Sequence, residues 1–253
     1  MTTPACEFCG LVTLAPCTTE VQGNHCPHAP ESAVIAEGAL RGLRRKHYRV
    51  IYADPPWTYE TYSDKGKGRS PEQHYECMTL DEIKALPIKE IAAKDCVLFM
   101  WVIDTHLPMA LDVMAAWGFT YKTKGFNWIK LNRLPDDPLD HPPVSDPSAY
   151  FTGMGHWSRA NPEDCLLATC GKPQRNEKGK GVRRLVVAER REHSRKPDEV
   201  YTRIETLVPG PYCELFARTD RSGWDQAGDQ VGKFGFRYQP LPDAELSEIE
   251  DLI

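Results

Sequence analysis

The feature that most constrains this chain is the segment 51–57, Ile-Tyr-Ala-Asp-Pro-Pro-Trp. The apolar residues 50–52 favour a β-strand, which must end at Pro55 because proline lacks the N–H that a strand ladder needs. Asp54 is therefore predicted at the carboxyl end of a strand, where ligands bind in open α/β sheets. The segment combines the Asp54 carboxylate with a stiff turn, whose carbonyls stay clear of local N–H bonds, and with the ring of Trp57. These parts suit the binding of a flat, amine-bearing base.

The rest of the chain predicts the sheet around this turn. Apolar runs alternate with helical patterns from residue 48 onwards, which indicates an α/β domain with a parallel-rich sheet. The predicted strands are Tyr48–Ala53, Cys96–Val102, Asn127–Leu131, Asp164–Cys170, Leu185–Ala188 and Tyr212–Ala217. The predicted helices, each ended by a proline or glycine, are Thr79–Leu86, Thr105–Trp117 and Pro197–Val208. We expect three regions: an extension over 1–30, one main domain over 31–240 and an acidic tail over 241–253.

The composition argues against a membrane or secreted protein. The chain is 41% hydrophobic and 26% charged, and no run approaches the roughly 20 apolar residues of a membrane span. Its first residues lack the basic and apolar regions of a signal peptide, so we expect a cytoplasmic protein. The extension either binds zinc or is an unstructured Cys-rich segment, and its candidate ligands are Cys6, Cys9, Cys17, His25, Cys26 and His28. No metal is expected in the active site.

The net charge of −5 does not by itself indicate a nucleic-acid-binding protein, but the charges are unevenly distributed. Residues 172–196 contain ten Lys and Arg against three acids. Such a basic segment can follow a phosphate backbone, and we expect nucleic acid to run along it. A solvated run of charge is the alternative. The long segments 59–73 and 133–158 are expected to be functional loops.

The turn at Asp54 suits the methylation of adenine. The exocyclic amine of adenine is a poor nucleophile because its lone pair is delocalised into the ring. Two acceptors that take its N–H bonds would leave the lone pair aimed at an electrophilic methyl group. Asp54 and the Pro55 carbonyl are the predicted acceptors, and Trp57 is predicted to stack on the base. Such a site works by positioning and by stabilising the developing positive charge. A tight turn with Trp57 in the core is the alternative.

The segment Asp54-Pro55-Pro56-Trp57 resembles the catalytic signature of the MT-A-seventy family. These are N6-adenine methyltransferases related to the catalytic subunit of the eukaryotic mRNA adenosine methyltransferase. The resemblance covers residues 48–231 through ordered segments, which include Tyr75–Glu82, Phe99–Val102, Trp117–Phe119, Trp128–Lys130, Gly155–Trp157, Glu163–Leu166, Lys196–Glu199, Glu214–Arg218 and Gly228–Gln230. It implies a Rossmann-like S-adenosylmethionine-dependent methyltransferase sheet that is circularly permuted, with the catalytic motif before the cofactor motif.

The resemblance also implies roles for individual residues. The catalytic residues are Asp54, Pro55, Pro56 and Trp57. The residues implied to bind S-adenosylmethionine are Lys196, which pairs with the donor's carboxylate, Phe216, Arg218, Asp220, Asp229 and Gln230. The residues implied to line the acceptor pocket are Tyr75, Trp128, Lys130, His156, Trp157 and Glu163. Three of these residues have structural alternatives: Trp128 could belong to the core, Lys196 could be a lysine at a helix start, and Arg218 could form a surface ion pair. The chain departs from the family at Asp229, where Asn is usual, and at Thr219–Arg221, where eukaryotic members have a His-Asn pair.

These features together predict an enzyme that methylates the N6 amine of adenine in DNA, because the compact size resembles bacterial or phage members. One alternative is the same reaction on RNA. Another is a catalytically silent nucleic-acid-binding partner subunit, although such subunits have lost the signature that is present here. A base in a duplex must be flipped out to reach such a pocket. The loop 133–150 occupies the family's partner interface, so a homodimer or heterodimer is a further alternative to a monomer.

Overall fold

The computed structural model describes residues 34–35, 38–58, 77–133, 135, 141–143, 145–155, 157–192, 195–218 and 220–228. These residues form a seven-stranded sheet in the order β5-β3-β4-β2-β1-β6-β7. The strands are β1 (Tyr48–Ala53), β2 (Ala92–Val102), β3 (Thr120–Leu131), β4 (Glu163–Cys170), β5 (Leu185–Glu189), β6 (Tyr212–Leu215) and β7 (Trp224–Ala227). The helices are α1 (Leu80–Ala85), α2 (Ile88–Ile91), α3 (Leu107–Ala116) and α4 (Glu199–Leu207), and the 3-10 turns are η4 (Asp104–His106), η6 (Pro147–Ala149) and η7 (Glu177–Gly181).

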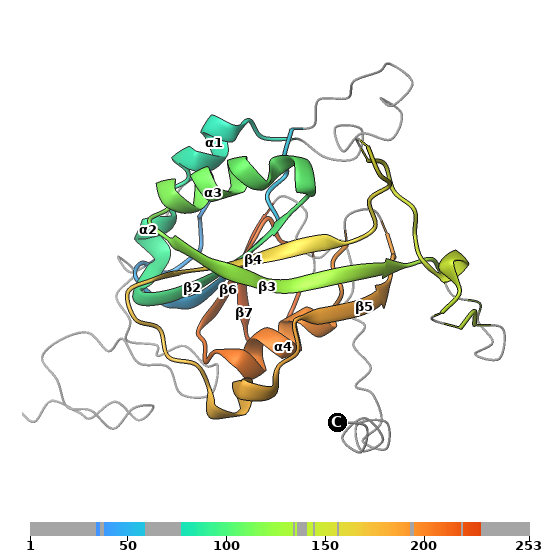
Figure 1. Ribbon diagram of the computed structural model, residues 1–253. Helices are drawn as coiled ribbons and strands as arrows, with labels where there is room; N and C mark the ends of the chain where they lie inside the picture. The colour runs from blue at the N-terminus through green and yellow to red at the C-terminus, as the bar shows by residue number, and fades with distance from the viewer. Residues whose placement is uncertain are drawn as a thin grey trace, which may run out of the picture.

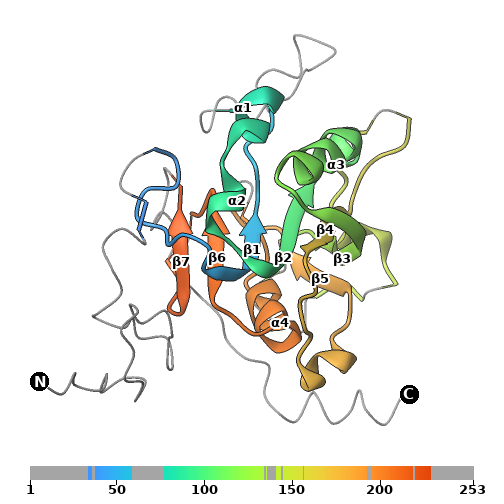
Figure 2. The ribbon, with the colours of Figure 1, turned by 90° about the vertical axis from the view of Figure 1, so that its left-hand side faces the viewer.

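Helices cover both faces of the sheet, as Figures 1 and 2 show. Helices α1, α2 and α3 pack on one face, where Ile83, Ile91 and Val113 join the core. Helix α4 packs on the other face through Val200 and Ile204. Successive side chains of a strand point to opposite faces, so an apolar strand such as β1 contributes to both cores. The predicted α/β class is confirmed.

The ends of the strands form two opposite rims of the sheet, which are called its edges from here on. Strand β1 lies parallel to β2 and β6, whereas β4 runs antiparallel to β2 and β3. The sheet is therefore mixed rather than simply parallel-rich. The carboxyl ends of β1, β2, β3, β5 and β6 and the amino end of β4 share one edge, which holds Asp54 and Glu163 and is called the site edge. The opposite edge, which holds Tyr48 and Cys170, is called the far edge.

All six predicted strands are present, and β1 has the predicted bounds. Strands β2 and β3 begin earlier than predicted, at Ala92 and Thr120, because pairing with neighbouring strands extends them through residues without an apolar pattern. Strand β6 ends at Leu215 because Phe216 has φ of +61°, in the left-handed region. The short, largely polar strand β7 and helix α2 were not predicted.

The predicted helices are confirmed, with shorter bounds. Helix α1 begins after Thr79, which forms a capping box: the Glu82 N–H donates to Thr79 Oγ1 and the Thr79 N–H donates to Glu82 Oε2 (3.3 and 2.8 Å). Helix α3 starts after η4, and α4 starts at Glu199 rather than Pro197. Helix α3, at ten residues, is the longest in the described ranges, where no helix is long and apolar enough to cross a membrane.

Two features of the predicted organisation stay predictions. The extension over 1–30 and the tail over 241–253 lie outside the described residues. The circular permutation depends on which strands hold the cofactor. The strand order does bring the last strands of the chain, β6 and β7, beside the first strand, β1.

Candidate active site

The chain turns sharply where β1 ends, and its own backbone holds the turn. The Trp57 N–H donates to the carbonyl of Pro55, and the Met78 N–H donates to the carbonyl of Pro56, both at 2.9 Å. The expectation that these carbonyls stay clear of local N–H bonds is therefore wrong for Pro55. A carbonyl oxygen has two lone pairs, so Pro55 keeps one for a second donor.

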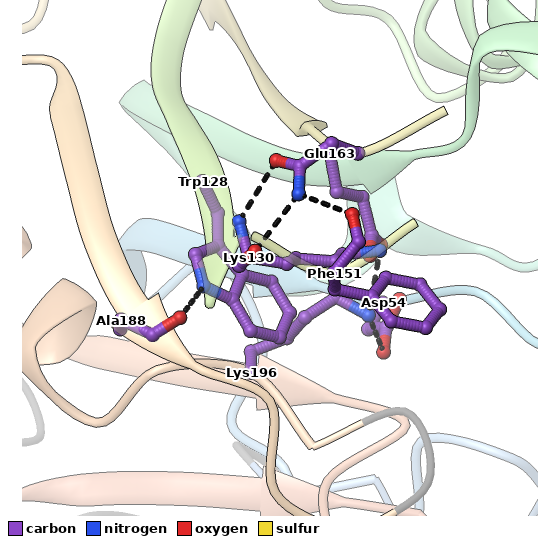
Figure 3. A network of polar contacts seen from close by, with 8 residues as sticks. Asp54, Trp128, Lys130, Phe151, Glu163, Ala188 and Lys196 are labelled. Atoms are coloured by element: carbon purple, nitrogen blue, oxygen red, sulfur yellow. Dashed lines mark hydrogen bonds and ion pairs between the residues drawn. The ribbon is translucent and has the colours of Figure 1, made fainter. Parts of the chain in front are cut away.

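Asp54 belongs to a buried network of four charges (Figure 3). Lys196 Nζ lies 2.7 Å from Asp54 Oδ2 and 3.1 Å from Glu163 Oε1. Lys130 Nζ lies 2.8 Å from Glu163 Oε2. The side chains of Lys196 and Glu163 are only 8% and 10% exposed. Two carboxylates and two ammonium groups balance each other's charge, which is what burial of ionised groups requires.

The network shifts the pKa values of Lys196 and Glu163 towards their charged forms. Burial alone would lower the pKa of Lys196, but Asp54 and then Glu163 outweigh burial, so that pKa is raised. Burial alone would raise the pKa of Glu163, but Lys196 and then Lys130 lower it to about 2. An ionised carboxylate only accepts hydrogen bonds, which is the property that an acceptor for an amine N–H needs.

Asp198 fixes the loop that presents Lys196. Arg191 Nη1 lies 2.6 Å from Asp198 Oδ2, and Arg191 Nη2 donates to the Lys196 carbonyl at 2.9 Å. Arg195 Nη2 lies 3.2 Å from the same Asp198 oxygen, and both of these side chains are 6% exposed. Asp198 was not predicted as a site residue, although its place in the segment Lys196–Glu199 was a signal. Arg191 and Arg195, which the sequence assigns to the nucleic-acid surface, serve inside the domain instead.

The basic run over 172–196 is divided between the two edges of the sheet. Strand β4 carries the chain from the site edge to the far edge, so the residues that follow Cys170 lie at the far edge. Strand β5 then returns to the site edge at Glu189. Only the later part of this segment therefore lies near the site edge, and the path of nucleic acid along the segment stays a prediction. The basic residues that follow β4 at the far edge are Lys172, Arg175, Lys178 and Lys180. Arg184 lies between the two edges, where its Nη2 donates to Thr123 Oγ1 at 3.1 Å.

The predicted acceptor-pocket residues have different surroundings. Lys130 and Glu163 belong to the charge network described above. Trp128 is 3% exposed and belongs to the core, and its Nε1 donates to the Ala188 carbonyl of β5 at 2.9 Å (Figure 3). Trp157 is 97% exposed. Tyr75 and His156 lie outside the described residues.

Trp57 lies against the core. It is 8% exposed, and its ring centroid is 5.9 Å from that of His106, a buried residue that sequence reasoning missed. The Trp57 Nε1 is buried without a hydrogen-bond partner among the residues described. Stacking of Trp57 on a base stays a prediction, and it requires more of the indole to be uncovered than is uncovered here.

A cavity of about 320 Å³ lies at the carboxyl ends of β6 and β7. Its lining combines the turn after β1 with the ends of these two strands: Pro56, Leu215, Phe216, Ala227 and Gly228, together with Ala39, Leu40, Cys77, Met78, Glu82 and Leu86. Gly228 lies so close to the backbone after β6 that a Cβ would be 2.6 Å from the Ala217 nitrogen. Of the predicted donor-binding residues, Phe216 lines the cavity, Arg218 is half-buried and Asp220 is exposed. Asp229 and Gln230 lie outside the described residues.

Glu214 is a buried acid near the site that the sequence did not single out as a site residue. It is 7% exposed, and Tyr201 donates its hydroxyl to Glu214 Oε1 at 2.8 Å. Burial raises the pKa of Glu214 to about 8, the Tyr201 hydrogen bond opposes the rise, and Asp54 adds to it. Glu214 therefore titrates near neutral pH within reach of the charge of Asp54.

Within the described ranges, no group of three or more His, Cys, Asp or Glu side chains could hold a metal ion. The predicted zinc ligands between Cys6 and His28 lie outside those ranges, so zinc binding stays untested.

Known proteins resemble this chain over most of its length. The MT-A70 family matches residues 48–230. The type II methyltransferase M.MunI of Mycoplasma sp is 31% identical in an alignment of 205 residues that covers 75% of this chain and 80% of that protein. The human N(6)-adenosine-methyltransferase catalytic subunit METTL3 is 30% identical in an alignment of 220 residues that covers 81% of this chain but 33% of that protein. The MT-A70-like N(6)-adenosine-methyltransferase of Arabidopsis thaliana is 30% identical over 188 residues, with 24% of its length covered.

Proposed function

The chain belongs to the MT-A70 methyltransferase family, and from this membership we propose that it transfers a methyl group from S-adenosylmethionine to the N6 amine of adenine in DNA. The observation that carries the proposal is the carboxylate of Asp54, held by Lys196 at the end of β1. DNA is favoured because M.MunI, a type II methyltransferase, is matched over 80% of its length. RNA is the second candidate because METTL3, an N(6)-adenosine methyltransferase, is also similar, although only 33% of it is covered.

We assign the acceptor side of the reaction to the turn after β1. Asp54 accepts one N–H of the adenine amine, and the Pro55 carbonyl accepts the other with its second lone pair. The ion pair with Lys196 limits the movement of the Asp54 carboxylate. Positioning of this kind, together with carboxylate charge near a nitrogen that becomes positive, lowers the barrier without a strong general base.

We assign the donor to the cavity at the ends of β6 and β7. Its volume of about 320 Å³ and its mostly apolar lining suit a nucleoside, and Pro56 places it next to the catalytic turn. When bound, S-adenosylmethionine supplies the electrophilic methyl group. Phe216 would contact the nucleoside, and Lys196 would share its N–H donors between the carboxylates of the site and that of the donor. Arg218, Asp220, Asp229 and Gln230 complete the proposed donor site.

We assign the nucleic acid to the site edge. Arg190 is exposed there, and its guanidinium lies 3.8 Å from the centroid of the Phe151 ring. Trp157 is also exposed, which suits stacking on an extruded base. Tyr75, Trp128, Lys130, His156 and Glu163 stay assigned to the acceptor pocket. A cytoplasmic location and a dimer through the loop 133–150 are further parts of the proposal.

Methyl transfer from labelled donor to matched single-stranded and double-stranded DNA and RNA tests the function. We expect N6-methyladenine in DNA from the wild type and a loss of at least about a thousandfold in Asp54→Asn, with donor affinity by calorimetry retained. Asp112→Asn, on the exposed side of α3, is the matched control and should keep full activity. Greater transfer to RNA would replace DNA as the substrate, and full activity of Asp54→Asn would remove the assigned mechanism.

A further inference from the structure

His106 lies under the catalytic turn, at the end of the neighbouring strand. It ends the 3-10 turn η4, which follows β2, and it is 6% exposed. Its Nε2 lies 3.0 Å from the carbonyl oxygen of Thr58, the residue after the catalytic signature. Its ring is the one that lies 5.9 Å from Trp57. A buried histidine thus contacts both the last residue of the signature and the backbone just beyond it.

The two partners of the His106 ring define its tautomer. A carbonyl oxygen only accepts hydrogen bonds, so Nε2 must carry the proton and donate to Thr58. In a neutral ring, Nδ1 is then an acceptor, and the Thr105 hydroxyl at 2.9 Å can donate to it. Both ring nitrogens are therefore used, and the orientation of the ring is set from two sides.

The backbone of the turn has complementary supports. Met78 donates to the Pro56 carbonyl and accepts a bond from Thr58 Oγ1 at 2.8 Å. Lys196 holds the Asp54 side chain at the other end of the turn. His106 adds a bond to the Thr58 carbonyl from the direction of β2. The distance between the amine acceptors depends on this backbone, and errors of about 1 Å in such positions can cost about a hundredfold in rate.

We propose that His106 is a positioning residue for methyl transfer: its Nε2–H holds the Thr58 carbonyl and thereby fixes the turn that carries Asp54, Pro55 and Trp57. The inference rests on the proposed function, because it names what aligns the acceptors for the amine. His106 itself does not contact the base or the donor in this role. Its loss should therefore lower kcat and leave donor affinity unchanged.

Two amide substitutions separate this role from simple packing. The side-chain nitrogen of glutamine can occupy the place of Nε2 in histidine. The side-chain nitrogen of asparagine corresponds to Nδ1 instead, and the asparagine side chain is too short to reach the Thr58 carbonyl. We expect His106→Gln to keep kcat within about threefold of the wild type and His106→Asn to lose about tenfold. Donor affinity by calorimetry should stay within about twofold in both variants. His47, which directly precedes β1 at the far edge, provides the control, and His47→Asn should be unaffected.

The results of these experiments distinguish a failure of the positioning role from a failure of the proposed function. An inactive wild type would overturn the proposed function and with it this inference. With an active wild type, equal kcat values for the glutamine and asparagine variants would overturn the positioning role. A loss of donor affinity in proportion to kcat would overturn it as well, because a general collapse of the site would explain both. The predicted order, with thermal unfolding midpoints of the two variants within a few degrees of each other, would support it.

Discussion

The site edge and the far edge of the sheet use the same kinds of charged residue in opposite ways. At the site edge, Lys196 and Lys130 are largely buried and joined to the carboxylates of Asp54 and Glu163. At the far edge, Lys178 and Lys180 lie on the surface in η7. Lys178, Lys180 and Lys196 come from one chain segment but have different surroundings, because β4 and β5 carry the chain to different edges. A basic residue in the sequence therefore indicates a function only once the edge of the sheet at which it lies is known.

The largest difference between the edges should come from removing a buried cation. Lys196→Met leaves Asp54 and Glu163 facing each other with one compensating lysine. We expect methyl transfer to fall by more than about a hundredfold and the free energy of unfolding to fall by about 3 kcal/mol. Urea denaturation and steady-state kinetics measure the two effects. The control Lys178→Met at the far edge should change neither, and a stable, active Lys196→Met would refute the comparison.

The acid that fixes the Lys196 loop should have the next effect. Asp198→Asn removes the charge shared by Arg191 and Arg195, and Arg195 is buried. We expect a loss of about 2 kcal/mol in the free energy of unfolding and of about tenfold in kcat. Glu199→Gln is the matched control, because its ion pair with Arg203 is partly exposed and should be worth less than about 1 kcal/mol. Equal losses in the two variants would show that Asp198 is an ordinary helix-start residue.

The free energy of unfolding at acid pH should also distinguish the two edges. The pKa of Glu163 is about 2 in the folded protein against an ordinary value of 4.5. A lowered pKa stabilises the fold above about pH 4.5, and that stabilisation is lost as the pH falls towards 2. Glu163→Gln should therefore flatten the dependence of unfolding free energy on pH in this window. Glu177→Gln, an exposed acid at the far edge, should leave the slope as it is in the wild type.

The smallest effect is expected at the far edge itself. The double variant Lys178→Glu and Lys180→Glu should keep the KM for DNA within about twofold and leave the salt dependence of binding unchanged, since neither residue contacts phosphate in our proposal. Arg190→Glu at the site edge should instead weaken binding about tenfold and lower the salt slope by about 1. Fluorescence anisotropy at several salt concentrations measures both. Weaker DNA binding by the far-edge variant would show that the far edge also contacts nucleic acid.

Part of the fold could be read from local pattern, and part could not. The bounds of β1 depend on neighbours in the sequence, and they were predicted from those neighbours. The early part of β3 and the whole of β7 form strands because a partner strand pairs with them, so their polar patterns concealed them. His106 and Asp198 carry no local pattern that marks a site, because their roles depend on what folds against them.

The sequence by itself determined that Asp54 stands at the end of a strand in a stiff, aromatic turn, because proline geometry and apolar patterning act over a few residues. Only the tertiary structure decided that Lys196, 142 residues away, forms an ion pair with Asp54. It also decided which basic residues share the edge of that pair. Both outcomes depend on the direction of β4 and the path of β5, and strand pairing between distant segments is set by packing of the whole sheet rather than by local sequence.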